Sequence, residues 1–152
     1  MAVSTDSIEN GRRIPWLPLV AILLAMVGVG DSIYLTWHHY TAEAVPCSLT
    51  GGCEMVLTSP YATIYDIPIA LFGAVAYADA FVFALLAALG RRPFWWLFGV
   101  QATLMAAFSG WLVYVQANYI HAFCQFCLLS AATSVSLFLV FVISLFTGRN
   151  SR

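Results

Sequence analysis

Four long apolar stretches occupy most of this chain, and they restrict the folds that are open to it. They run over residues 14–37, 67–89, 94–119 and 123–146. Each exceeds the roughly 20 residues that a helix needs to cross a hydrocarbon core about 30 Å thick. None alternates strictly between polar and apolar residues, as the strands of a membrane barrel do. The sequence therefore predicts an all-α integral membrane protein, built as a bundle of four transmembrane helices.

The composition leads to the same expectation. Of the 152 residues, 62% are hydrophobic and only 9% are charged, whereas a soluble domain carries about 25% charged residues. The formal net charge of -1 provides no basic surface, so we expect no nucleic-acid partner. The length suits one domain, which we expect to span residues 1–152.

The arginines predict the orientation of the bundle. All six cationic residues are arginines, and they lie in three groups, at residues 12–13, 91–92 and 149–152. Two predicted crossings separate each group from the next, so all three lie on one side, which the positive-inside rule makes the cytoplasm. Both chain ends are then cytoplasmic, and the loop at residues 38–66 is extracytoplasmic. A cleaved signal peptide is the alternative for the first stretch, but it would need an unusually long apolar region and would break this agreement.

The outer loop is expected to contain a short helix. Residues 54–65 are moderately apolar but too short to cross a bilayer, which indicates a short interfacial helix or cap. Ser59 suits the N-cap of such a helix and Pro60 its first turn. Pro68 suits the first turn of the second long helix for the same reason.

Four cysteines form two pairs, and both pairs fall on the outer side. Cys47 and Cys53 lie in the outer loop, while Cys124 and Cys127 form a Cys-x-x-Cys motif at the expected start of the fourth helix. A helix N-terminus stabilises a thiolate, and residues i and i+3 share a face, so these two sulfurs can close a small disulfide ring. Disulfides form and persist in extracytoplasmic compartments.

The positions of the two pairs suggest an electron relay. The loop pair is accessible to a soluble thiol protein, whereas the helix pair lies near the lipid. Electrons would enter at the loop pair, pass by thiol–disulfide exchange to Cys124, and leave from Cys127 to a lipid-soluble quinone. Two thiols and a quinone give a disulfide and a quinol, so the sum takes no net proton from either bulk phase.

Two alternatives to the relay remain open. The protein could be a non-catalytic tetraspan scaffold in which all four cysteines form structural disulfides. It could also hold zinc between the two pairs, although an oxidising compartment and the five-residue spacing of the loop pair argue against this. We therefore expect no metal.

Several sequence motifs occur together along the chain. A Cys-x₅-Cys pair is followed six residues later by Ser59, then by an Ile-Pro-x-x-Leu-Phe-Gly run at 67–73 and by the Cys-x-x-Cys pair. In this order they resemble the vitamin K epoxide reductase family, and residues 30–36 resemble its bacterial members. The resemblance implies a four-helix bundle around a quinone of the menaquinone, ubiquinone or phylloquinone type, capped by the outer loop. It also implies a bacterial plasma membrane.

The same resemblance implies a role for each cysteine. Cys127 would contact the quinone, and Cys124 would exchange with the loop. Cys53 would be the shuttle to Cys124, and Cys47 would form the mixed disulfide with the partner. The implied function is a quinone-dependent thiol oxidase that reoxidises an extracytoplasmic thioredoxin-fold protein for disulfide-bond formation.

The implied quinone contacts are Ser59, Ile69, Phe72 and Ala131. Animal members look to have an asparagine at the position of Ile69 and a tyrosine at that of Ala131, so simple quinone reduction is favoured over epoxide reduction. Many bacterial members carry a fused thioredoxin-like domain. Because this chain ends at Arg152, we expect its thioredoxin-fold partner to be a separate protein.

Two acidic residues fall inside the predicted spans. A charge in the membrane interior is costly, so we expect Asp79 to be neutral, hydrogen-bonded and directed into the bundle. For Asp31, anchoring of the outer loop and tuning of the pocket both remain open.

Overall fold

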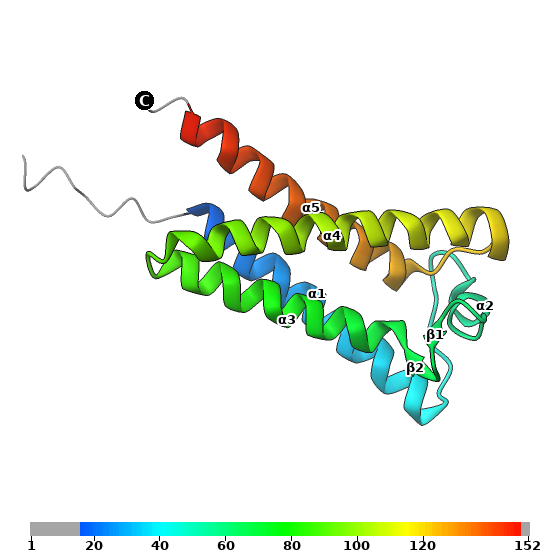
Figure 1. Cartoon of the computed structure of the whole chain (residues 1–152). Coiled ribbons are helices and arrows are strands. Elements are labelled where there is room, and N and C mark those ends of the chain that lie inside the picture. The colour runs from blue at the N-terminus through cyan, green and yellow to red at the C-terminus, as the bar shows by residue number, and fades with distance from the viewer. Residues whose placement is uncertain (1–15, 150–152) are drawn as a thin grey trace, which may run out of the picture.

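Long helices dominate the computed structural model, which describes residues 16–149 (Figure 1). In chain order the elements are α1 (Trp16–Thr41), α2 (Cys53–Leu57), β1 (Thr63–Ile64), β2 (Ile67–Pro68), α3 (Ile69–Ala88), α4 (Arg92–Val115), the π-helical segment η2 (Gln116–Ile120) and α5 (Gln125–Arg149). Four helical spans in this part of the chain, α1, α3, α4 with η2, and α5, are long and apolar enough to cross a membrane. The predicted all-α tetraspan bundle is confirmed, and the chain is a multi-pass membrane protein.

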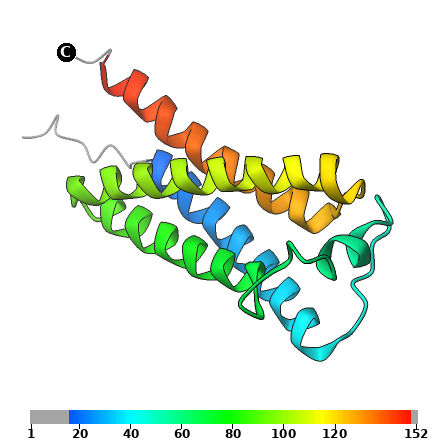
Figure 2. The ribbon, with the colours of Figure 1, turned by 45° about the vertical axis from the view of Figure 1, so that its right-hand side comes forward.

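The short elements gather at one end of the bundle. α1 packs along α3, α4 packs along α5, and further contacts join α1 to α5 and α3 to α4. Both views place α2 and the small hairpin where α1 ends and α3 begins, with the α3–α4 turn at the opposite end (Figures 1 and 2). Residues 91–92 and Arg149 lie at that opposite end, as the predicted topology requires. The remaining arginines lie outside the described residues: Arg12, Arg13 and Arg152.

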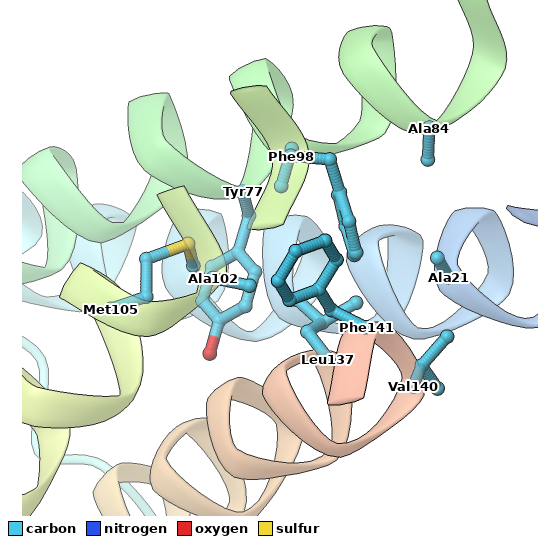
Figure 3. Packing of buried hydrophobic residues seen from close by; sticks show 10 residues of the cluster. Ala21, Tyr77, Ala84, Phe98, Ala102, Met105, Leu137, Val140 and Phe141 are labelled. Atoms are coloured by element: carbon cyan, nitrogen blue, oxygen red, sulfur yellow. The ribbon is translucent and has the colours of Figure 1, made fainter. Parts of the chain in front are cut away.

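Aromatic side chains fill the middle of the bundle, opposite glycines. Tyr77 and Phe98 are almost fully buried there, next to Phe141 (Figure 3). A methyl group added at Gly28 would overlap the Tyr77 ring, and one added at Gly99 would overlap the Phe141 ring. These glycines therefore let α1 approach α3 and α4 approach α5 closely, as small residues do between membrane helices.

The helix boundaries differ from the predicted ones by a few residues at both ends of the bundle. α4 begins at Arg92 and α5 ends at Arg149, whereas residues 94 and 146 were predicted. α1 continues to Thr41 instead of ending at residue 37. α3 begins at Ile69 instead of residue 67, because the two preceding residues pair with β1. Pro68 consequently lies just before the helix and not in its first turn. α5 begins at Gln125, two residues later than predicted.

The predicted helix over residues 54–65 is wrong in extent, because α2 ends at Leu57. The Ser59 hydroxyl donates a hydrogen bond of 2.7 Å to the carbonyl of Val56. Ser59 therefore closes the end of α2 and does not cap the start of a helix, and Pro60 lies in a turn. Polar side chains that bond the local backbone favour such turns over continued helix.

A hairpin of two short strands follows α2, and together they form a cap, residues 53–68, over this end of the bundle. β1 and β2 are antiparallel, with Thr63 opposite Pro68 and Ile64 opposite Ile67. Tyr65 and Asp66 between them both have positive φ angles, of 50° and 64°. This is the backbone pattern of the tight hairpin turn that matches strand twist, and it holds the cap against the start of α3.

Candidate functional site

All four cysteines lie together at the end of the bundle where α2 and the hairpin lie. Cys53 and Cys124 are fully buried in one apolar cluster, and Cys47 and Cys127 pack at its edge. Cys47 and Cys53 are joined by a disulfide with a Cα–Cα distance of 5.8 Å, whereas Cys124 and Cys127 are thiols. The outer loop therefore brings an oxidised pair against a reduced one.

Backbone contacts hold the loop pair on the segment that leads into α5. A Cβ atom added at Gly52 would lie 2.8 Å from the carbonyl oxygen of Phe123. Only a glycine therefore fits against the backbone at this position. On the far side of the loop, the Leu49 N–H donates a hydrogen bond of 2.9 Å to the Gln125 side chain. The residues on either side of Cys124 thus both contact the loop.

Gln116 fixes the backbone of Cys124. Its side-chain oxygen accepts a hydrogen bond of 3.0 Å from the Cys124 N–H, and its main-chain oxygen accepts one of 3.3 Å from Ala122. Gln116 is buried and begins η2, and π-helical turns are frequent at functional sites. The sequence did not single out Gln116, although an amide late in an apolar helix before a Cys-x-x-Cys motif is a usable signal.

The environment of Cys124 favours a thiolate. The Cys127 N–H donates a hydrogen bond of 3.4 Å to the Cys124 sulfur. A hydrogen bond from the Cys127 thiol, partly offset by burial, lowers the pKa of Cys124 from its ordinary value of 9.0 to about 7. Because the thiolate is the form that attacks a disulfide, Cys124 can exchange at neutral pH.

A cavity of about 330 Å³ lies beside Cys127, among the four long helices and the segment that contains α2 and the hairpin. Cys127 lines this cavity, whereas Cys124 does not. Its wall includes every residue that the resemblance suggested for quinone contact: Ser59, Ile69, Phe72 and Ala131. Their role in binding a quinone stays a prediction.

The cavity wall is mostly apolar, and several of its polar side chains are hydrogen-bonded within the protein. The Tyr77 hydroxyl donates a hydrogen bond of 2.6 Å to the Ser130 carbonyl and lies 2.8 Å from the Ser134 hydroxyl. Figure 3 shows this ring reaching from α3 toward α5. Sequence reasoning had not selected Tyr77. An apolar wall with a few polar groups and one thiol suits a flat, apolar ring with polar oxygens.

The cavity opens toward the lipid-facing side of α3 and α4. Phe72, Leu104 and Phe108 line it and are also 48%, 63% and 45% exposed. A side chain that both lines a cavity and lies on the outer surface marks the mouth of that cavity. A ligand dissolved in the bilayer could therefore enter between these helices.

The two carboxyl groups of the spans have opposite environments. Asp79 is exposed and makes no hydrogen bond to the described part of the chain, so the prediction that it faces the bundle is wrong. Tyr77 and Ala80 occupy the inward face of α3 at this level, which turns Asp79 outward. Asp31, in contrast, is only 8% exposed, and neither carboxylate oxygen has a hydrogen-bond partner within residues 16–149.

Metal binding has little support in residues 16–149. This region holds no group of three or more His, Cys, Asp or Glu side chains placed to bind a metal ion. The disulfide between Cys47 and Cys53 also occupies two of the four sulfurs that a zinc site would need.

Comparison with known proteins identifies the family. Residues 19–142, which include all four cysteines, match the Vitamin K epoxide reductase family. The chain is also similar to Thiol-disulfide oxidoreductase LTO1 of Arabidopsis thaliana, with 35% identity over 121 residues, or 74% of this chain and 32% of the relative. It thus spans about a third of the length of that curated relative. The chain belongs to the vitamin K epoxide reductase family.

Proposed function

We propose that this protein is a membrane thiol oxidase that passes electrons from an extracytoplasmic thioredoxin-fold protein to a quinone. The main support is the meeting of a loop disulfide, a buried Cys-x-x-Cys pair, and a lipid-facing cavity lined by Cys127 alone among the cysteines. The family and the printed name of the plant relative support redox chemistry on thiols. The three arginine groups of the sequence support an extracytoplasmic location for the cysteines.

The loop pair receives the electrons. Cys47 is the more accessible of the two, so a thiolate of the partner attacks it and forms a mixed disulfide while Cys53 leaves as a thiolate. A second thiol of the partner then attacks the mixed disulfide, which releases the oxidised partner and leaves both loop cysteines reduced. The partner loses two electrons in this step, and the loop pair gains them.

The buried pair takes the electrons onward. Cys53 attacks an oxidised Cys124–Cys127 bond at Cys124, and Cys47 then attacks Cys53, which restores the loop disulfide and leaves Cys124 and Cys127 as thiols. This is the redox state described above. A quinone, when bound, supplies an acceptor for two electrons and two protons. Cys127 lies on the cavity wall beside it, and Cys124 closes the disulfide.

The proposal is tested with purified protein in lipid nanodiscs, a reduced thioredoxin-fold protein as donor, and decylubiquinone and menadione as separate acceptors. We expect quinol formation that depends on the donor and is lost in Cys53→Ser and in Cys127→Ser. Ser48→Ala, an exposed change in the same loop, should behave as the unchanged protein. Folded protein whose cysteines do not cycle would instead support the scaffold alternative.

A further inference from the structure

The amide of Gln116 has two ends, and the protein uses one of them. The side chain is only 3% exposed, and its oxygen accepts the hydrogen bond of 3.0 Å from the Cys124 N–H. Because an N–H donor needs an acceptor, the oxygen and not the nitrogen must face Cys124. The NH₂ group therefore occupies the other branch of the side chain.

This NH₂ group is unpaired but is not sealed inside the protein. It carries two N–H donors, and its one amide hydrogen bond within residues 16–149 is made through the oxygen. In the same part of the chain, the unpaired side-chain atoms that protein encloses completely are the carboxylate oxygens of Asp31. The Gln116 nitrogen therefore borders open space, and the space that Gln116 lines is the cavity. Two amide donors are thus available to a molecule in the cavity.

Other polar groups of the cavity wall are less available. The hydroxyls of Ser59 and Tyr77 donate to backbone carbonyls, and so does the NH₂ group of Gln101. Ile69 and Ala131 line the cavity with apolar side chains. The oxygens of a flat, apolar ring in this cavity need donors, because a buried acceptor left without one costs about 1–3 kcal/mol.

Gln116 is also joined to the redox pair. Among the polar side chains that line the cavity, it is the one that forms a hydrogen bond to the Cys-x-x-Cys motif within the described residues. Cys127 belongs to the same motif and lines the same cavity. The amide donors and the thiol therefore border the cavity as parts of one hydrogen-bonded unit.

We propose that the NH₂ group of Gln116 donates a hydrogen bond to a carbonyl oxygen of the quinone and so holds the ring beside Cys127. The proposal rests on the quinone-linked function above. Gln116 then has two roles at once: its oxygen fixes the backbone of Cys124, and its nitrogen positions the electron acceptor.

The first test observes the amide directly. The chain has three glutamines, Gln101, Gln116 and Gln125, so protein in lipid nanodiscs with ¹⁵N-labelled glutamine amides should give three pairs of side-chain N–H signals. Gln101→Met and Gln125→Met each remove one pair and so assign the third to Gln116. Both cysteine pairs are kept oxidised, so that added decylubiquinone stays in its quinone form.

Decylubiquinone should move the Gln116 signals downfield, as expected for a newly formed hydrogen bond. The signals of Gln125, which does not line the cavity, should stay in place. Unmoved Gln116 signals in protein that has bound the quinone would overturn the proposal. This readout needs no change at Gln116, so it holds even if a Gln116 variant does not fold.

The second test observes the quinone, labelled with ¹³C at its carbonyls. One carbonyl stretching band should lie at lower frequency in the protein than in empty nanodiscs, and Gln116→Met should return it toward the lipid value. One neutral hydrogen bond is worth about 0.5–1.5 kcal/mol, so Gln116→Met should also weaken binding by about three- to tenfold. Gln125→Met should keep both the band and the affinity. The same lowered band in Gln116→Met as in the unchanged protein would overturn the proposal.

These outcomes separate the hydrogen bond from the function beneath it. If decylubiquinone and menadione change no signal of the unchanged protein, and their carbonyl bands equal those in empty nanodiscs, neither quinone binds and the proposed function itself is wrong. If a quinone binds while the Gln116 signals stay in place, the function stands and the role of the Gln116 nitrogen is wrong.

Discussion

The side-chain oxygen of Gln116 accepts a hydrogen bond of 3.0 Å from the backbone N–H of Cys124. Both residues are buried, and Gln116 also lines the cavity, so one side chain joins the reactive cysteine to the proposed acceptor site. Without this oxygen, the N–H of Cys124 would have no partner in an apolar cluster.

Replacement of Gln116 by leucine should therefore destabilise the outer end of the bundle. Leaving a buried donor unsatisfied costs about 1–3 kcal/mol, and we expect a loss of that size in the free energy of unfolding in mixed micelles. Gln101→Leu is the matched control, because Gln101 also lines the cavity but makes one long bond of 3.4 Å to Ala76. An equal effect of the two changes would contradict the role given to Gln116.

The low pKa of Cys124 should depend on the Cys127 thiol. In protein with the loop disulfide intact, thiolate absorbance should show Cys124 half-ionised near pH 7, below its ordinary value of 9.0. Cys127→Ala removes the donor and should raise the pKa of Cys124, so that less thiolate is present at neutral pH. Cys127→Ser keeps an O–H donor and should retain most of the effect. Equal titrations of the two variants would show that another group stabilises the thiolate.

Gly52 should be needed for the loop to dock. Its Cβ would meet the Phe123 backbone, which cannot rotate away as a side chain can. Overpacking of this kind costs about 1–3 kcal/mol, so Gly52→Ala should slow exchange between Cys53 and Cys124 by about tenfold. Gly110→Ala, where a methyl group meets open space, should leave the rate unchanged. A normal exchange rate in Gly52→Ala would mean that the loop docks in another way.

Two glycines of α1 should respond differently to substitution. Gly28→Ala would press a methyl group into the Tyr77 ring and should lower the free energy of unfolding by about 1–3 kcal/mol. Gly30→Ala meets no neighbouring atom and should be neutral or slightly stabilising, because alanine favours helix more than glycine does. Unfolding in mixed micelles measures both, and similar losses would contradict close packing of α1 on α3.

The sequence predicted the parts of the fold that hydrophobic length decides. Four helices long enough to cross a membrane, a long loop after the first of them and the Cys-x-x-Cys pair at the start of the last helix all follow from apolar runs and spacing, and the structure has them. The cap was harder to predict. Residues 54–65 suit a helix by composition, but the Ser59 hydroxyl bonds the Val56 carbonyl and α2 stops. A hairpin whose turn uses Tyr65 and Asp66 carries no glycine signal.

The candidate site was predictable where chemistry marks the residue type. Cysteines can be recognised in the sequence by their chemistry. Gln116 and Tyr77 cannot, because their hydrogen bonds go to Cys124 and Ser130, which only the fold brings near them. The outward position of Asp79 and the inward position of Asp31 depend on helix rotation. In α3, where nearly every position is apolar, the periodicity that would indicate this rotation is absent.

The most direct test of the relay is to trap its central step. In the double variant Cys47→Ser and Cys127→Ser, the buried sulfurs Cys53 and Cys124 are the cysteines that remain, and mild oxidation followed by peptide mass spectrometry should find them joined in one disulfide. The reciprocal variant, with Cys53→Ser and Cys124→Ser, leaves Cys47 and Cys127 and should give far less of the cross-link. Folded protein in which Cys53 and Cys124 never join, or join no more readily than the reciprocal pair, would contradict electron transfer between the loop and the membrane pair.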